Sequence, residues 1–197
     1  MTPDLLFALV TFAFVTSLSP GPNNLMLMAS GANFGFRRTV PHMFGVGLGF
    51  MLMVLLVGLG LSQVFDAYPV SYTILNAASL LYLLYLAWKI ANAAAPKEAN
   101  GLGTPMSFLQ AAAFQWVNPK AWAMALTSIS LYAPDRTMAS MLMVALVFGA
   151  INLPCVSSWT VLGQQMRRVL TNPARLRVFN WTMAVLLVGS VLPVLLA

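Results

Sequence analysis

The chain carries very little charge. Only 7% of its 197 residues are charged, while 60% are apolar, and the mean hydropathy is +0.83. A soluble domain has about 25% charged residues. The composition therefore excludes an ordinary water-soluble domain and indicates an integral membrane protein.

Cysteine and histidine are almost absent. The single cysteine, Cys155, excludes an intramolecular disulfide and any Cys-x-x-Cys motif. The single histidine, His42, cannot form a metal site by itself. The sequence also lacks a phosphate-binding fingerprint for ATP. We therefore expect no metal and no cofactor, and we do not expect an enzyme.

Carboxylates are scarce as well, and all four lie at the ends of apolar segments or between them: Asp4, Asp66, Glu98 and Asp135. Many proton-coupled carriers use a buried Asp or Glu as a relay. In this chain Lys120 is the one strong candidate for titration inside an apolar segment. A transport function would draw on a gradient, through a coupling ion that the sequence does not identify.

Six apolar segments are present, each close to the roughly 20 residues that a membrane-spanning helix needs. They cover about residues 4–30, 41–62, 70–92, 106–132, 138–163 and 177–196. We predict an all-α integral membrane protein, a single transporter domain over 1–197 with six transmembrane helices.

The basic residues lie mostly in short loops, so we do not interpret the net charge of +6 as nucleic-acid binding. They gather in the first, third and fifth connections: Arg37, Arg38, Lys89, Lys97, Arg167, Arg168, Arg175 and Arg177. The second and fourth connections contain Asp66, and Asp135 with Arg136. Because cytoplasmic loops of membrane proteins are enriched in Lys and Arg, we predict that both termini are periplasmic.

The first apolar segment is interrupted by Ser19-Pro20-Gly21-Pro22-Asn23-Asn24. Proline has no N–H to donate, and it drives the preceding residue out of the α region. Irregular backbone at membrane depth persists only where it is buried in protein or lines a wet cavity. The stretch therefore predicts a binding site. The alternative is an ordinary proline kink that neighbouring helices repair.

A second break, Val117-Asn118-Pro119-Lys120, interrupts the fourth segment. Pro119 falls at nearly the same offset in the second half as Pro22 in the first, and Arg38-Thr39 recurs as Arg136-Thr137. Halves of three spans must have opposite orientations. We therefore predict two inverted three-helix repeats, about 1–95 and about 104–197, with broken first and fourth helices. Matching breaks of this kind point to a transporter site.

Each break can start a new helix near the membrane centre, because Asn is a good N-cap and Pro suits the first helical position. A helix N-terminus offers free N–H groups and about half a positive charge, which suits a carboxylate. The carbonyls that end the preceding half-helices suit an ammonium group, so one cavity can hold an amino acid. The candidate substrate-binding residues are Ser19, Pro20, Gly21, Pro22, Asn23, Asn24, Gln115, Asn118, Pro119 and Lys120.

Simpler roles remain open for several of these residues. Lys120 can extend toward the membrane surface from a helix end, and the asparagines can be helix caps alone. Gln115 can face a neighbouring helix rather than a cavity. Asn152, which precedes Pro154 in the fifth segment, is expected to have a packing role.

These motifs together resemble the LysE/RhtB superfamily of amino-acid exporters over nearly the whole length. The resemblance rests on SPGPNN, the glycine-rich second segment and three further stretches: Gly35-Phe36-Arg37, Tyr85-Leu86-Ala87-Trp88-Lys89 and Gln115-Trp116-Val117-Asn118-Pro119-Lys120. The start Met1-Thr2-Pro3, the doubled Asn23-Asn24 and the stretch 86–91 resemble its cysteine and O-acetylserine exporter branch.

The resemblance implies a secondary transporter of a bacterial inner membrane that exports small amino acids or their derivatives by alternating access. The substrate would be neutral, cysteine- or O-acetylserine-like or homoserine- or threonine-like. The expected partners are this substrate and the lipid bilayer, with a homodimer as a further expectation. The alternatives are a carrier of another small anion or a lipid-linked solute, and a non-transporting membrane subunit. A single cysteine disfavours a carrier of thiol electrons.

Overall fold

The computed structural model describes residues 1–61, 63, 67–68, 70–93, 104–170 and 172–190, and these residues contain helices and no strand. The elements are α1 (Pro3–Leu18), α2 (Pro22–Phe34), α3 (Phe36–Leu56), the π-helical turn η1 (Val57–Leu61), α5 (Val70–Ala91), α6 (Phe108–Phe114), the 3-10 turn η2 (Gln115–Val117), α7 (Pro119–Tyr132), α8 (Met138–Met166) and α9 (Pro173–Gly189). Asp66, Lys97 and Glu98 lie outside the described residues.

Three helices are long and apolar enough to cross a membrane, namely Phe36–Leu61, Thr73–Ala91 and Met138–Met166. A fourth candidate is the pair Pro3–Leu18 and Pro22–Phe34, which is bent by 53° at its break. The all-helical membrane class is thus confirmed. The fourth and sixth predicted segments are also helical, but α6, α7 and α9 do not qualify as spans by length and composition in the part of the chain described.

The second long helix begins earlier than the sequence predicts. Helix α3 begins at Phe36 rather than at residue 41, and it contains Arg37, Arg38 and Pro41 in its first turns. A single residue, Gly35, joins α2 to α3, with a φ of 81° that glycine adopts without steric cost. The first connection is therefore a sharp turn between two helices, not a basic loop.

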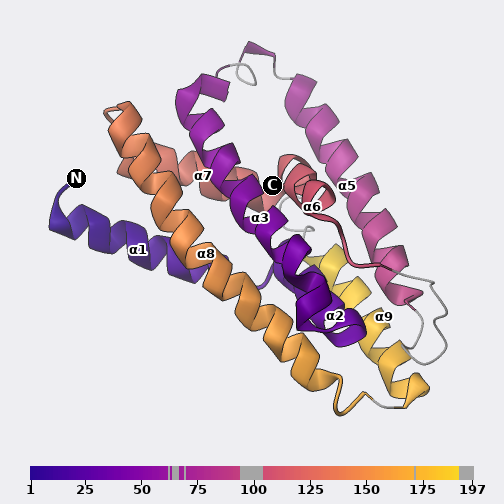
Figure 1. The fold of residues 1–197 in the computed structure, drawn as a ribbon. Coiled ribbons are helices and arrows are strands. Elements are labelled where there is room, and N and C mark those ends of the chain that lie inside the picture. Colours follow the sequence, from indigo (N-terminus) through magenta and orange to yellow (C-terminus); the bar gives the residue numbers. More distant parts are fainter. Residues whose placement is uncertain (62, 64–66, 69, 94–103, 171, 191–197) are drawn as a thin grey trace.

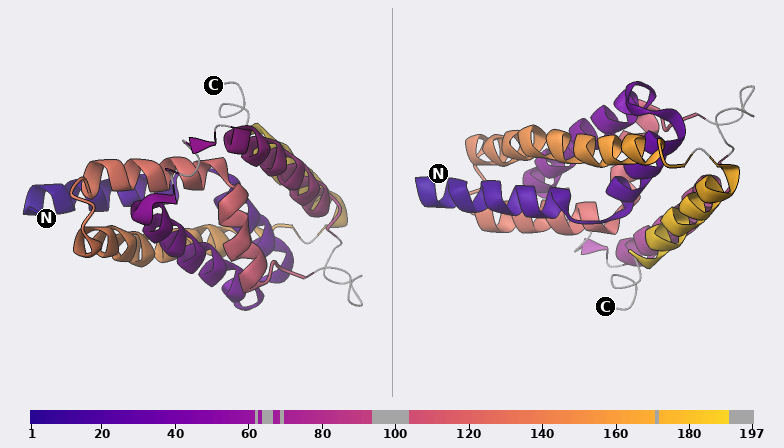
Figure 2. Two further views of the ribbon diagram at one scale, coloured as in Figure 1. Left: turned by 90° about the horizontal axis from the view of Figure 1, so that it is seen from above. Right: turned by 90° about the horizontal axis from the view of Figure 1, so that it is seen from below.

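Helices α3 and α8 pack on each other near the centre of the molecule, and the other helices pack around them (Figure 1). Helix α1 packs along α8, and α6 packs along α3. Helices α5 and α9 pack on each other and form a pair that is inclined away from the rest in both views of Figure 2. Each half of the chain thus contributes one helix to the central pair and one to the outer pair.

Glycines allow the half-helices to approach the central pair closely. A Cβ on Gly31 of α2 would collide with the carbonyl of Thr160 in α8, and one on Gly163 of α8 would collide with the carbonyl of Met28 in α2. Backbone thus meets backbone where α2 crosses α8.

Helix α3 meets α6 in the same manner. A Cβ on Gly45 would collide with the carbonyl of Phe108, and one on Gly49 would lie 2.6 Å from the Cα of Ala112. These two crossings fix the half-helices next to both chain breaks and hold the breaks at the centre of the molecule.

Candidate functional site

The first break is a short extended stretch between α1 and α2. Ser19 has φ −60° and ψ 145°, and Gly21 is fully extended with φ 177° and ψ 176°. Pro22 is the first residue of α2, where its missing N–H costs nothing. The break that the sequence predicts is therefore confirmed, and α2 begins in the middle of the chain's first apolar segment.

The second break follows a 3-10 turn of three residues. Asn118 is extended, with φ −97° and ψ 107°, and Pro119 begins α7. The side chain of Asn118 caps this helix, because its Oδ1 accepts a hydrogen bond of 3.2 Å from the Lys120 N–H. The expected pairing of an asparagine N-cap with a proline at the first helical position is confirmed.

The structure brings the two breaks together through Lys120. Its Nζ donates to the Ser19 carbonyl at 2.8 Å, to Ser19 Oγ at 2.8 Å and to the Pro20 carbonyl at 3.3 Å. The lysine stem also covers Gly21, where a Cβ would lie 2.7 Å from Lys120 Cδ. The ammonium group of the second half therefore sits against the backbone of the first break, rather than extending to the membrane surface.

A second link joins the halves through two amide side chains. Asn23 Nδ2 donates to Gln115 Oε1 at 2.8 Å, and Gln115 Nε2 donates to Asn23 Oδ1 at 3.3 Å. Gln115 also donates to the Ala111 carbonyl at 2.8 Å and is completely buried. Gln115 thus faces the opposite break, and its partner Asn23 caps no helix.

The carbonyls at the end of α1 are not free, in contrast to the expectation from the sequence. The Ser17 and Ser19 carbonyls both accept from Asn24 Nδ2 at 2.8 Å, and the Leu18 carbonyl accepts from Trp159 Nε1 at 3.0 Å. Lys120 takes the Ser19 and Pro20 carbonyls. Side chains of the protein itself therefore complete the hydrogen bonding of this helix end, as buried backbone requires.

The N-terminus of α2 is different, since Gly21 has no side chain with which to cap it. Within the described part of the chain, no hydrogen bond of the protein satisfies the N–H groups of Asn23 and Asn24. These two donors and the helix dipole give this end of α2 the character of an anion site.

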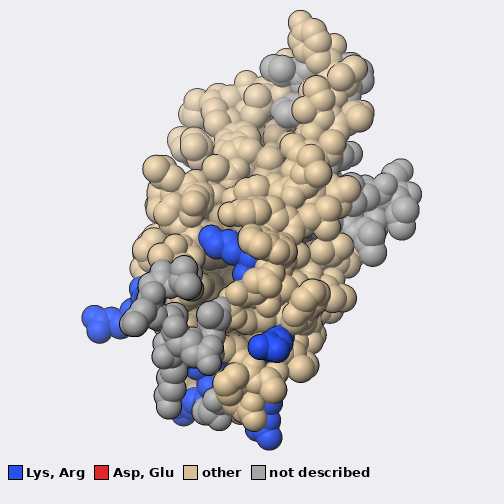
Figure 3. Space-filling model, turned by 90° about the vertical axis from the view of Figure 1, so that its right-hand side faces the viewer, with Lys and Arg blue, Asp and Glu red and all other residues tan. Residues whose placement is uncertain are grey.

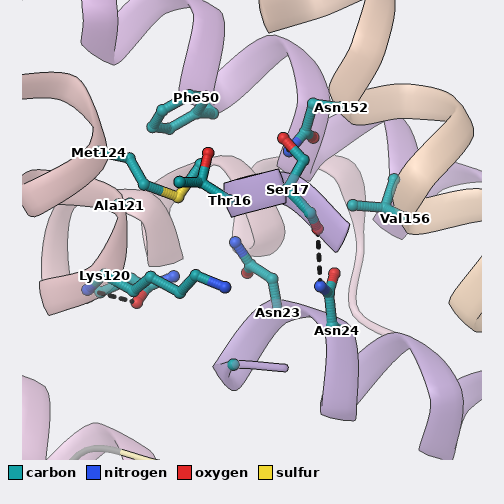
Figure 4. Close-up of a pocket in the computed structure, with 12 residues that line it drawn as sticks. Thr16, Ser17, Asn23, Asn24, Phe50, Lys120, Ala121, Met124, Asn152 and Val156 are labelled. Atoms are coloured by element: carbon teal, nitrogen blue, oxygen red, sulfur yellow. Dashed lines mark hydrogen bonds between the residues drawn. The ribbon is translucent and has the colours of Figure 1, made fainter. Parts of the chain in front are cut away.

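A small cavity of about 20 Å³ lies between the two breaks. Figure 4 shows side chains of both halves pointing into it, with Lys120 and Asn23 on one side and Ser17 and Asn152 on another. The lining comes from five helices and both breaks: Thr16, Ser17, Gly21, Asn23, Asn24, Phe50, Asn118, Lys120, Ala121, Met124, Asn152 and Val156. Among these described residues are polar groups and one cation, Lys120, and none of them is a carboxylate.

Asn152 of α8 has a polar atom without a partner in this cavity. Its Nδ2 donates to Ser17 Oγ at 3.2 Å, while its Oδ1 is buried and accepts no hydrogen bond. Reversing the amide would leave the Nδ2 without an acceptor instead. Because an unsatisfied buried polar atom is costly, this acceptor indicates a place for a donor from a ligand or a water molecule.

The predicted site residues divide into three groups by position. Gly21, Asn23, Asn24, Asn118 and Lys120 line the cavity. Ser19, Pro20 and Gln115 hold cavity-lining side chains by hydrogen bonds. Pro22 and Pro119 are the buried first residues of the two half-helices and set their directions.

Three polar lining residues are not among those predicted from the sequence. Thr16 and Ser17 lie within one turn before the first break, so the helical period of α1 is the signal that could have found them. Asn152 was expected to pack only, because no local pattern shows that α8 crosses α1 at this position. No group of histidine, cysteine or acidic side chains in the described part of the chain could hold a metal ion.

Comparison with known proteins gives a consistent result. The family described as LysE type translocator matches residues 14–196. Proteins named cysteine/O-acetylserine efflux protein from Escherichia coli strain K12 and Shigella sonnei strain Ss046 are 33% identical over 196 residues, which cover 95% of this chain and 96% of each relative. A protein of that name from Escherichia coli O139:H28 is 37% identical over 142 residues, 71% of both chains. No solved structure matches the chain.

Proposed function

The chain belongs to the LysE type translocator family, and on that premise we propose that it exports a small neutral amino acid or a close derivative across a bacterial inner membrane. Its similarity to cysteine/O-acetylserine efflux proteins over 95% of its length favours substrates of their kind. The observation that carries the proposal is the meeting of two broken helices around one polar cavity. A protein that only needed to cross the bilayer would have no use for this irregular backbone.

The cavity offers a partner for each charged end of an amino acid. The substrate carboxylate would bind at the start of α2, to the free N–H groups of Asn23 and Asn24. The positive charge of Lys120 would add to this attraction, because no carboxylate lines the cavity to neutralise it. An anion is therefore favoured at this end of the site.

The substrate ammonium would bind where the Lys120 ammonium now lies. Three oxygens of Ser19 and Pro20 already surround a primary ammonium at 2.8–3.3 Å, and Asn152 Oδ1 offers a further acceptor. In this proposal Lys120 fills the ammonium position of the empty carrier. When the substrate arrives, Lys120 moves to the carboxylate.

The small size of the cavity implies a closed carrier. A space of about 20 Å³ holds about one water molecule, and an amino acid is far larger. Substrate entry therefore requires the half-helices to separate, first on one side of the membrane and then on the other.

An inverted repeat of six spans would provide this movement, and the helix packing supports such a repeat. An internal two-fold axis would exchange α1 with α6 and α8 with α3. The packing of α1 on α8 would then correspond to the packing of α6 on α3, and both packings are present. In both halves a proline also begins the second half-helix. Rocking of one repeat against the other around a fixed central site would give alternating access.

The test is a transport assay with the purified protein in proteoliposomes. The panel of labelled substrates contains cysteine, O-acetylserine, threonine, homoserine, leucine, lysine and arginine. We expect saturable transport of the small neutral members and none of lysine or arginine, whose side chains would place a second cation beside Lys120. Transport of no amino acid by folded protein would contradict the proposal and favour a carrier of another small anion or a non-transporting subunit.

A further inference from the structure

A second hollow, which shares no lining residue with the proposed substrate site, lies where the turn between α2 and α3 meets the end of α8. Its volume is about 520 Å³. Four of its eight lining residues are arginines, two from each wall: Arg37, Arg38, Arg167 and Arg168. The other lining residues are Phe34, Gly35, Phe36 and Gln164. This hollow, called the arginine pocket below, has no role in the proposed transport site.

A hydrogen bond and a glycine hold the two walls of the arginine pocket close together. The Phe36 N–H donates to Gln164 Oε1 at 2.6 Å, which ties the start of α3 to α8. Gly35 brings the walls close, because a Cβ at this position would lie 3.5 Å from a guanidinium nitrogen of Arg167. The arginines therefore converge on one hollow rather than spreading over the surface.

Among the residues that the structure describes, no carboxylate lies near enough to balance the positive charge of the arginine pocket. The acidic residues in the described ranges are Asp4, at the start of α1, and Asp135, before α8. The pocket is at the other end of α8, a helix of 29 residues and thus about 40 Å long. Figure 3 shows Lys and Arg over the lower half of one face of the molecule, with no Asp or Glu visible there.

The backbone adds a further attraction for anions. Helix α3 begins in the pocket, and Gly35 provides no side chain to cap it. Its dipole therefore adds to the arginine charges. Arg38 lies over the ring of Phe34, 5.7 Å from its centre, and this contact leaves the guanidinium edge free to bind oxygens.

The location indicates the source of the anion. The candidate span Phe36–Leu61 begins in the pocket and the candidate span Met138–Met166 ends beside it, so the pocket lies where the membrane surface meets the protein. We propose that the arginine pocket binds the phosphate headgroup of an anionic phospholipid, with the two phenylalanines against the start of its acyl chains. Since none of the described lining residues is a carboxylate that could pair with an ammonium, a headgroup without an ammonium, such as phosphatidylglycerol, is favoured over phosphatidylethanolamine.

The test measures thermal unfolding of the full chain in detergent during titration with phosphatidylglycerol or phosphatidylethanolamine. We expect phosphatidylglycerol to raise the unfolding temperature and phosphatidylethanolamine to have little effect. In the double variant Arg167→Gln/Arg168→Gln, the half-saturating amount of phosphatidylglycerol should rise roughly thirtyfold, because two guanidinium hydrogen bonds to the phosphate are lost. The matched control is Arg175→Gln/Arg177→Gln, which removes two exposed arginines of α9 outside the pocket and should leave the titration unchanged.

A second pair of substitutions, Arg37→Gln/Arg38→Gln, removes the charges of the opposite wall and should have the same effect, which keeps the test valid if one variant does not fold. Equal losses in the control would contradict the proposal, because they would show general attraction to a basic surface. Stabilisation by glycerol phosphate or inorganic phosphate as strong as that by the lipid would also contradict it, in favour of a site for a soluble anion. An equal response to both lipids would exclude headgroup recognition.

Discussion

Lys120 is the residue on which the centre of the molecule depends. Its ammonium group makes three hydrogen bonds to neutral oxygens of Ser19 and Pro20 and has no carboxylate beside it in the cavity. A cation held in this way joins the two halves and at the same time attracts an anion. The same side chain can therefore close the empty carrier and recognise the substrate.

Replacing Lys120 with Met should lower efflux by about two orders of magnitude. The substrate carboxylate would lose one hydrogen bond to a charged group, which contributes about 1.5–3 kcal/mol. The substitution retains the apolar stem, so we expect the protein to insert in the membrane and remain folded. The measurement is the initial rate of substrate efflux from proteoliposomes with equal amounts of protein. Lys89→Met, on α5 and outside the cavity, is the control, and unchanged efflux by the Lys120 variant would disprove the site assignment.

Asn152→Leu should affect binding more than stability. The substitution removes an acceptor that has no partner in the protein, so the substrate loses about one hydrogen bond and its KM should rise about tenfold. The substitution also removes the 3.2 Å hydrogen bond from Nδ2 to Ser17 Oγ, so the unfolding temperature should fall only slightly. A large fall in that temperature with unchanged KM would show that Asn152 has only a packing role.

Asn180→Leu gives the contrasting case. Asn180 exchanges hydrogen bonds with Asn33 and also donates to the Ala93 carbonyl. Its removal leaves buried partners unsatisfied, which costs about 1–3 kcal/mol. We expect a lower unfolding temperature in detergent and an unchanged KM, because Asn180 is not part of the cavity.

At the scale of elements, close crossings between helices position both breaks. Helix α2 crosses α8 at Gly31 and Gly163, and α3 crosses α6 at Gly45 and Gly49. In a bilayer, close packing through small residues is a main source of helix association. The half-helices keep their positions because glycine lets backbone touch backbone, although both breaks interrupt the regular hydrogen bonding.

Substitution by alanine, which adds one methyl group, should destabilise the protein more at the glycines of these crossings than at a glycine elsewhere. Gly163→Ala places a Cβ against the Met28 carbonyl, and the forced shift should cost about 1–3 kcal/mol. We expect the unfolding temperature in detergent to fall by about 2–4 °C for each kcal/mol. At Gly47, the matched control on α3, a Cβ would find its nearest neighbour at 3.7 Å, an ordinary contact, so Gly47→Ala should be tolerated. Equal effects of both substitutions would contradict the crossing geometry.

At the scale of the whole molecule, positive charge gathers at the end of α8 where the arginine pocket lies. Arg37 and Arg38 share the arginine pocket with Arg167 and Arg168, so the first and fifth connections lie at the same end. Asp135 precedes the opposite end of α8. This arrangement supports the proposal that the arginine end faces the cytoplasm and both termini face the periplasm.

Cysteine labelling tests this orientation. In a Cys155→Ala background, Pro134→Cys should react with a membrane-impermeant maleimide in intact cells, because Pro134 is exposed in the turn beside Asp135, at the end proposed to be periplasmic. Gly101→Cys, in the third connection and outside the described residues, should react only after the membrane is permeabilised. The reverse pattern would invert the orientation, while reaction of both positions in intact cells would contradict the single span predicted between them.

The sequence alone determined the membrane class, the positions of both breaks and the residues that begin each half-helix. These features are local consequences of composition and of proline, glycine and asparagine chemistry. Pro22 and Pro119 start helices wherever the rest of the chain lies, and Asn118 caps its helix within two residues. The same local rules found the five cavity-lining residues that belong to the breaks themselves, because the breaks line the cavity with their own residues.

Only the tertiary structure decided which groups meet. Lys120 and Ser19 are 101 positions apart, and Asn152 and Ser17 are 135 apart, so no pattern along the chain could show that they share a cavity. The carbonyls at the end of α1 were expected to be free, and they are instead bound by Asn24, Trp159 and Lys120. The physical reason is that a buried backbone group takes the nearest donor in space, and the crossings of α8 and α7 over the first break determine which donor that is.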